Sequence, residues 1–198
     1  MNDLEGLSRE FEKSLRLRYF KETTIKETMR QLADFIHCLS VCHGVREAEA
    51  VTREMIEAYQ VRLYEHINSM GRPNGIACQN MTLGIVKRFM KFLKRNDYIV
   101  SDPAADISYA RLPRRLPAGI LSISEMRRIL HAPDTKTLLG YRDRTMFEVL
   151  YSTGVRRSEL GKLTLNDVDY HDGFLRINQG KGGKDRVVPL GRIACRYL

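Results

Sequence analysis

Residues 151–160 read YSTGVRRSEL, and the rest of the sequence is organised around this stretch. An apolar run ending at Leu150 precedes it, and Gly154 suits the left-handed backbone conformation that commonly ends a helix. A second helix is expected to restart at Val155, which places Arg156 at a turn between two packed helices. Because such a turn fixes the orientation of a side chain, Arg156 is a candidate ligand for an anion.

A glycine-rich segment follows at residues 179–186 (QGKGGKDR), between short apolar runs at 174–177 and 187–190. Apolar runs on both sides of a glycine-rich tip predict a β-hairpin, here with Lys181 at its tip. An arginine fork binds two phosphate oxygens at once, whereas a lysine is a mobile point charge that can donate a proton. Arg156 and Lys181 together therefore suit a phosphate ligand.

The two stretches resemble the tyrosine recombinase (phage integrase) family, in which a Thr-Gly-hydrophobic-Arg-x-Ser-Glu-Leu segment precedes a Gly-Lys-Gly-x-Lys-x-Arg hairpin. The resemblance implies that Arg156 is the first catalytic arginine, that Lys181 protonates the leaving 5′ oxygen, and that Glu159 braces the arginine. It also implies DNA integration or recombination through a 3′-phosphotyrosine, without a metal or other cofactor. The plain alternative is an exposed helix-cap arginine and a solvated turn lysine.

In the family, a His-x-x-Arg motif, a His or Trp and the tyrosine nucleophile all follow the hairpin. None is found between the hairpin and Leu198, and Tyr197 falls where the family has the helix after the hairpin. A His-x-x-Arg string at residues 43–46 lies far upstream and is interpreted as coincidence. We therefore expect this polypeptide to bind DNA without cutting it, and to expose apolar surface that favours self-association.

The composition agrees with an intracellular DNA-binding protein. The 198 residues are 43% hydrophobic and 29% charged, which is enough for a real core and argues against disorder. The net charge of +9 favours a polyanion such as double-stranded DNA, because neutralised phosphates release counterions. No signal peptide or membrane-spanning run is evident, so we expect a cytoplasmic protein, with a homo-oligomer on DNA as a further expectation.

Two histidines and two cysteines crowd into residues 37–43, which raises the question of a zinc site: His37, Cys38, Cys42 and His43. Their spacing is that of a helix core, and free cysteine is among the most buried residue types. We therefore interpret them as structural and expect no metal.

Residues 1–100 are predicted to form a helical, DNA-clamping core-binding domain, which resembles that of the family in helix number and order. A capping box is expected at Thr24 and Glu27, with a helix continuing to Gly44. A fourth helix, expected after a chain break at residues 71–75, has one apolar and one basic side. Its candidate DNA ligands are Lys87, Arg88, Lys91 and Lys94. The alternative is an ordinary solvated face.

Residues 101–118 are predicted to be a basic, proline-containing linker in which Arg114 and Arg115 contact DNA, a solubilising linker being the alternative. Residues 119–198 then form an incomplete α+β catalytic domain of tyrosine recombinase type, opened by a capping box at Ser122 and Glu125. Lys184 and Arg186, beside the hairpin tip, are further candidate phosphate ligands. The expected fold class is mainly α with a small antiparallel β-sheet.

Two other classes of protein remain open at this point. A stand-alone helical DNA-binding regulator would need no hairpin lysine, and a structural or interaction protein would show no steep salt dependence of DNA affinity.

Overall fold

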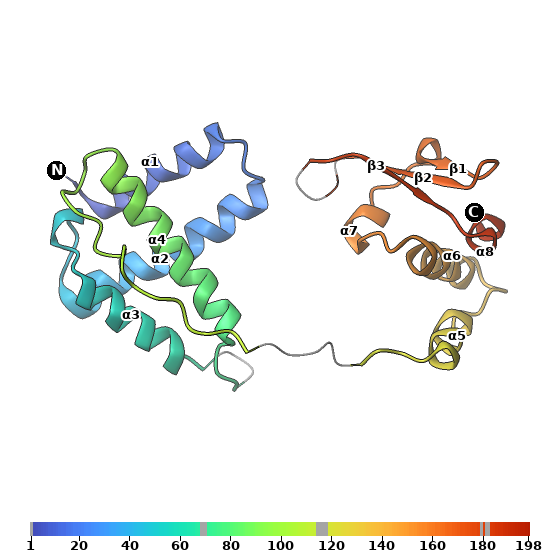
Figure 1. Ribbon diagram of the computed structural model, residues 1–198, viewed down its shortest axis with the longest axis horizontal. Coiled ribbons are helices and arrows are strands. Elements are labelled where there is room, and N and C mark those ends of the chain that lie inside the picture. Colours follow the sequence, from blue (N-terminus) through green and yellow to red (C-terminus); the bar gives the residue numbers. More distant parts are fainter. Residues whose placement is uncertain (1, 68–70, 114–118, 179, 181–182) are drawn as a thin grey trace. The chain divides into compact units, whose positions relative to one another are not determined.

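The computed structural model describes residues 2–67, 71–113, 119–178, 180 and 183–198. The chain divides into two compact units, residues 1–115 and 116–198, and each is described by itself (Figure 1). Helices dominate, and the described residues form a three-stranded antiparallel sheet, which confirms the predicted fold class. Within the described ranges, no helix is long and apolar enough to cross a membrane.

The first unit is a helical bundle. Its elements are α1 Leu4–Leu17, α2 Glu22–His43, the 3-10 helix η1 Ala48–Ala50, α3 Arg53–Glu65 and α4 Ile76–Arg95. The apolar stripe of α1 is buried, and its Phe11 ring lies 5.5 Å from that of Phe89, centroid to centroid. Helix α2 ends where predicted, because Gly44 takes the left-handed conformation with φ 66°. Helix α4 packs on α2 (Figure 1).

The capping box expected at Thr24 and Glu27 is wrong. Helix α2 begins earlier, at Glu22, and Lys21 is its N-cap residue without a side-chain cap. The Glu27 carboxylate instead accepts hydrogen bonds from Arg30 at 2.7 Å and from Gln31 at 2.5 Å. These partners one turn further on hold the pKa of Glu27 at about 2, chiefly through the Arg30 guanidinium.

Residues 99–110, most of which fall in the predicted linker, pack against the helical bundle. Ile99 and Ile107 are buried in its core. Asn80 of α4 forms two hydrogen bonds with the backbone of Ala110, at 2.7 and 2.9 Å. The segment up to Ala110 therefore belongs to the first unit. Arg114 and Arg115 lie outside the described residues.

The second unit combines short helices with the sheet. Its elements are α5 Ile123–His131, α6 Leu138–Thr153, α7 Arg157–Leu160, η2 Leu165–Asp167, β1 Val168–Asp169, β2 Phe174–Ile177, β3 Arg186–Pro189 and α8 Arg192–Tyr197. The capping box at Ser122 and Glu125 is present. Helix α6 ends at Gly154, which has φ 62°, as the sequence predicts.

The sheet has the order β1-β2-β3, so the strand at 174–177 is the middle one. The expected hairpin joins β2 to β3, with Ile177 opposite Arg186. Leu175 and Ile177 on the inner face of β2 pack with Val149 of α6 and with Ala194 of α8. Helix α6 and the sheet therefore form the rigid support on which α7 and the hairpin are held.

Candidate DNA phosphate site

Arg156 is the N-cap residue of α7, directly after the Gly154 turn. Its side chain is 54% exposed, whereas that of its partner Glu159 is only 7% exposed. The Glu159 carboxylate accepts the Arg156 backbone N–H at 2.9 Å and the Arg156 Nη1 at 3.0 Å. A buried acid therefore holds an exposed guanidinium in one orientation.

Arg186 of β3 shares the same carboxylate. Its Nη2 donates to Glu159 Oε2 at 2.7 Å and its Nη1 donates to Oε1 at 3.0 Å. This is the two-pronged geometry in which arginine binds carboxylates most strongly. The sequence suggested Arg186 as a phosphate ligand, but the structure places both of its terminal nitrogens on Glu159.

The contacts of Glu159 lower its pKa well below the usual range. The Arg186 guanidinium contributes most, followed by the backbone N–H of Arg156, and burial opposes both. The same contact raises the pKa of Arg186. Glu159 is therefore a carboxylate, rather than a carboxylic acid, at any physiological pH.

The base of the hairpin is held at two points. Asn178 donates to Asp167 Oδ1 at 2.5 Å, and the Gly180 N–H donates to the carbonyl of Lys184 at 3.0 Å. A Cβ on Gly180 would lie 2.8 Å from Arg186 Nη1 and 3.2 Å from Glu159 Oε1, so the hairpin backbone passes directly beside the carboxylate. Lys181 follows Gly180 in the sequence but lies outside the described residues, and Lys184 is exposed on the far arm of the hairpin.

Tyr197 is packed into the second unit. Its ring lies 5.1 Å from the Arg144 guanidinium carbon and 5.5 Å from the ring of Tyr141, centroid to centroid. Arg144 is itself buried and paired with Glu148 at 2.6 Å. Tyr197 therefore packs on Arg144 and Tyr141 of α6.

The four basic candidates on α4 do not behave alike. Lys87 is partly buried, and its ammonium donates to the carbonyls of Ala105 and Ile107 at 3.1 and 2.5 Å. Lys94 donates to the carbonyl of Val100. Arg88 and Lys91 are exposed, and Arg88 donates its Nε to the carbonyl of Gly84 at 3.3 Å. Lys91 and the terminal nitrogens of Arg88 are therefore the better candidates for contact with an external anion.

Arg88 and Lys91 border a surface hollow of about 440 Å³ at the ends of α1 and α4. Arg18 and Arg95 also line it, and its other lining residues carry no negative charge: Phe11, Ser14, Leu15, Phe20, Phe92 and Asn96. Sequence reasoning missed Arg18, because only the packing of α1 on α4 brings it to this side. Four cations around one hollow suit a polyanion.

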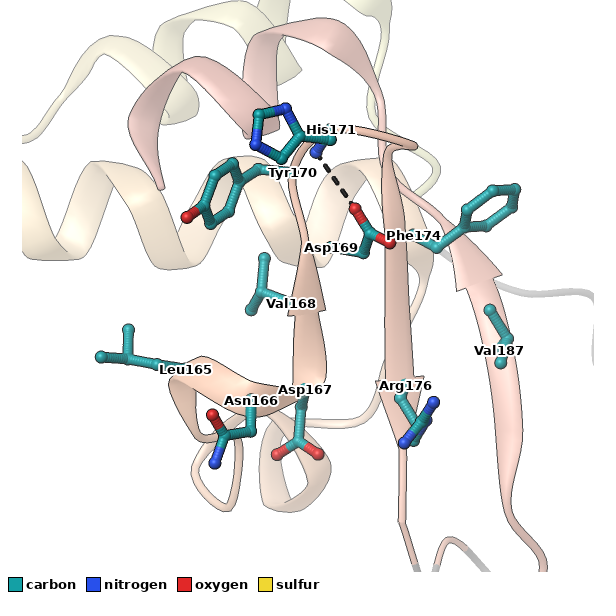
Figure 2. A pocket seen from close by; sticks show the side chains of 10 residues that line it. All are labelled: Leu165, Asn166, Asp167, Val168, Asp169, Tyr170, His171, Phe174, Arg176 and Val187. Carbon is teal, nitrogen blue, oxygen red and sulfur yellow. Dashed lines mark hydrogen bonds between the residues drawn. The ribbon is translucent and has the colours of Figure 1, made fainter.

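One hollow of the second unit does not include Arg156 or Glu159. It encloses about 560 Å³ beside β1 and β2, and Figure 2 shows its lining residues. The backbone N–H of His171 donates to Asp169 there at 3.1 Å, and the rings of Tyr170 and His171 lie 5.1 Å apart. Two aspartates, Asp167 and Asp169, face one arginine, so this hollow suits a phosphate less well than the surface at Arg156.

The two cysteines and two histidines near the end of α2 differ in how exposed their side chains are. Cys38 is buried, but Cys42 is exposed, contrary to the expected core position, and so are both histidines. Among the described residues, no three His, Cys, Asp or Glu side chains are placed to share a metal ion.

The comparisons with known proteins agree with this geometry. The sequence model of the phage integrase family matches residues 120–198. The chain is 40% identical over 155 residues to tyrosine recombinase XerC 2 of Ralstonia nicotianae, covering 78% of this chain and 45% of that protein. It is 33% identical over 181 residues to tyrosine recombinase XerD of Halalkalibacterium halodurans, covering 91% and 58%. The chain thus spans about half the length of the curated relatives it matches.

Two solved structures share the fold. A lambda integrase dimer bound to a COC′ core site matches with a TM-score of 0.70 at 19% identity, covering 94% of this chain and 48% of that one. The Tn1549 transposon integrase in complex with circular intermediate DNA matches with a TM-score of 0.70 at 16% identity, covering 100% and 63%.

The family match and the two Xer relatives place this helical unit and α+β unit in the tyrosine recombinase class. Residues 120–198 belong to the phage integrase family of this class.

Proposed function

We propose that this chain is the DNA-binding part of a site-specific tyrosine recombinase that acts in DNA integration or recombination. The observation that carries the proposal is the Arg156–Glu159 pair, in which a buried carboxylate presents an exposed guanidinium beside the hairpin of Lys181. Arg156 would hold the scissile phosphate and stabilise the negative charge that develops on it. Lys181 would protonate the leaving 5′ oxygen, and such general acids contribute roughly 10²–10⁴ in rate.

The first unit would supply affinity rather than chemistry. Arg18, Arg88, Lys91 and Arg95 surround a hollow that offers contacts to the DNA backbone. Lambda integrase has been solved as a dimer and as a tetramer on DNA. By analogy, we propose that the present chain forms a homo-oligomer on double-stranded DNA. We also propose that it acts in the cytoplasm.

The test is the affinity of the full chain for duplex DNA, measured by fluorescence anisotropy at several salt concentrations. We expect Arg156→Gln to weaken binding on the order of tenfold, since a hydrogen bond to a charged group contributes about 1.5–3 kcal/mol. Arg142→Gln removes the same charge from an exposed arginine of α6, and we expect it to change affinity by about twofold or less.

Three results would contradict the proposal. Equal losses in the two variants would mean that net charge alone drives binding. Unchanged affinity in Arg156→Gln would favour the second candidate, a helical DNA-binding regulator whose contacts come from the basic hollow of the first unit. An affinity that does not fall with salt would exclude DNA as the partner.

A further inference from the structure

Two arginines share one buried carboxylate in the second unit. Four donors converge on the two oxygens of Glu159: the backbone N–H and Nη1 of Arg156, and both terminal nitrogens of Arg186. Glu159 is 7% exposed, against 54% for Arg156 and 36% for Arg186. The carboxylate is therefore shielded from water, and its neutralisation depends on these two side chains.

The two arginines do not use Glu159 equally. Arg186 binds it with both prongs, at 2.7 and 3.0 Å, whereas Arg156 contributes one side-chain hydrogen bond at 3.0 Å. In the described part of the chain, Arg156 makes its side-chain hydrogen bond through Nη1, which leaves Nε and Nη2 for a ligand. One negative charge thus lies between two positive charges, and the closer pairing is with Arg186.

This asymmetry matters for phosphate binding. A lone Glu159 would pair with Arg156 fully and cancel its charge toward an incoming anion. With Arg186 on the same carboxylate, the three groups carry a net charge of about +1, presented at the exposed Arg156.

We propose that Arg186 is a positioning residue that acts through Glu159. It neutralises the carboxylate so that Arg156 keeps its charge and its free donors toward a DNA phosphate, and it holds Gly180 of the hairpin against the same acid. This inference rests on the proposed function, but it assigns Arg186 a role other than direct DNA contact.

The packing around Gly180 supports this role. A side chain at this position would meet Arg186 Nη1 and the Lys184 carbonyl, each 2.8 Å from the added Cβ. The hairpin backbone therefore lies directly against the Arg186–Glu159 pair, one residue before Lys181. A displacement of Arg186 would let Glu159 pair more fully with Arg156, and it would also shift Gly180 of the hairpin.

A double-mutant cycle on the full chain tests the proposal, with duplex DNA as the probe. We expect Arg186→Gln to lower DNA affinity about tenfold, because Glu159 then turns to Arg156. In a Glu159→Gln background, which has no charge to neutralise, the same change should cost about twofold or less. Equal losses in both backgrounds would mean that Arg186 contacts DNA directly, which overturns the proposal.

The matched control is Arg176→Gln on β2, an exposed arginine of the same sheet. It removes the same charge without touching Glu159, so we expect a small and equal effect in both backgrounds. If Arg186→Gln unfolds the second unit, Arg186→Lys replaces it. A single ammonium binds both carboxylate oxygens poorly, so the coupling with Glu159 should keep its sign and shrink. Equal losses for Arg186→Lys in both backgrounds would again overturn the proposal.

The failure of this inference is distinguishable from that of the proposed function. If the wild-type chain does not bind DNA, the proposed function fails, and the cycle is repeated with inorganic phosphate. The readout is then the phosphate-induced shift of the Arg156 side-chain NMR resonances. The positioning role is supported if Arg186→Gln weakens this NMR shift in the wild-type background but not in the Glu159→Gln background. No shift in the wild-type chain, or the same weakening in both backgrounds, overturns it.

Discussion

At the scale of single residues, the site depends on a buried acid that has two basic partners. The resemblance to tyrosine recombinases implied the pairing of Arg156 with Glu159. The structure shows that their three-residue spacing at the start of α7 brings the two side chains together. The sequence did not identify the Arg186 contact. That contact joins residues 27 positions apart and depends on the register of β2 against β3, which fixes which hairpin side chain faces α7.

The charge of Glu159 makes the second unit sensitive to acid. Its pKa is lowered in the folded protein, so the unfolded chain binds more protons once the pH falls below about 5. The stability contributed by this carboxylate is fully present above its unfolded pKa and is lost as the pH falls toward the folded value. We expect hydrogen exchange in β3 to accelerate below about pH 5 in the wild-type chain and much less in Glu159→Gln.

The control is Asp172→Asn, which removes an exposed carboxylate from the same unit. Exchange rates are compared at each pH after correction for the intrinsic chemical rate. A Glu159→Gln variant that loses protection with the same pH dependence as the wild-type chain would show that other carboxylates cause the acid sensitivity.

At the scale of elements, local signals predicted most of the secondary structure. The glycine ends of α2 and α6 and the hairpin at 174–190 all appear as expected, since each depends on neighbours within a turn or a strand. The capping box at Thr24 failed because an acid three residues after a threonine also suits pairing inside a helix. The docking of residues 99–110 was missed because only tertiary contacts, such as those of Asn80 with Ala110, hold them.

The contact between α2 and α4 includes a buried polar pair. Thr82 donates its hydroxyl to Gln31 Oε1 at 2.8 Å, and the two residues are 6% and 4% exposed. Thr82→Val keeps the shape but leaves the Gln31 oxygen without this donor. We expect a loss of about 1–3 kcal/mol in the free energy of unfolding, measured by urea denaturation with circular dichroism.

Thr82→Ser is the matched variant, because it retains the hydroxyl and removes one methyl group. Its loss should be about 0.5–1.5 kcal/mol, the usual range for deleting a buried methyl. A valine variant as stable as the wild-type chain would mean that the hydrogen bond contributes nothing to the packing of α2 on α4.

At the scale of the whole molecule, the net charge of +9 is shared by two units, which would contribute differently to the proposed DNA binding. The second unit carries the braced arginine, whereas the first carries four cations around one hollow. Composition predicted the polyanion, but it could not tell which basic residues are free. Lys87 and Lys94 look the same as Lys91 in the sequence, and only the fold shows that their ammonium groups are bonded to backbone carbonyls.

This difference predicts how the salt dependence of DNA binding responds to substitutions on α4. Each phosphate contact contributes about 0.9 to the slope of log affinity against log salt concentration. We expect Arg88→Gln and Lys91→Gln each to reduce the slope by about one contact, measured by anisotropy on the full chain. Lys94→Gln is the matched control and should leave the slope nearly unchanged, because the Lys94 ammonium already donates to Val100. An equal reduction by Lys94→Gln would show that DNA draws this lysine away from its carbonyl, and that the whole basic side of α4 acts as one surface.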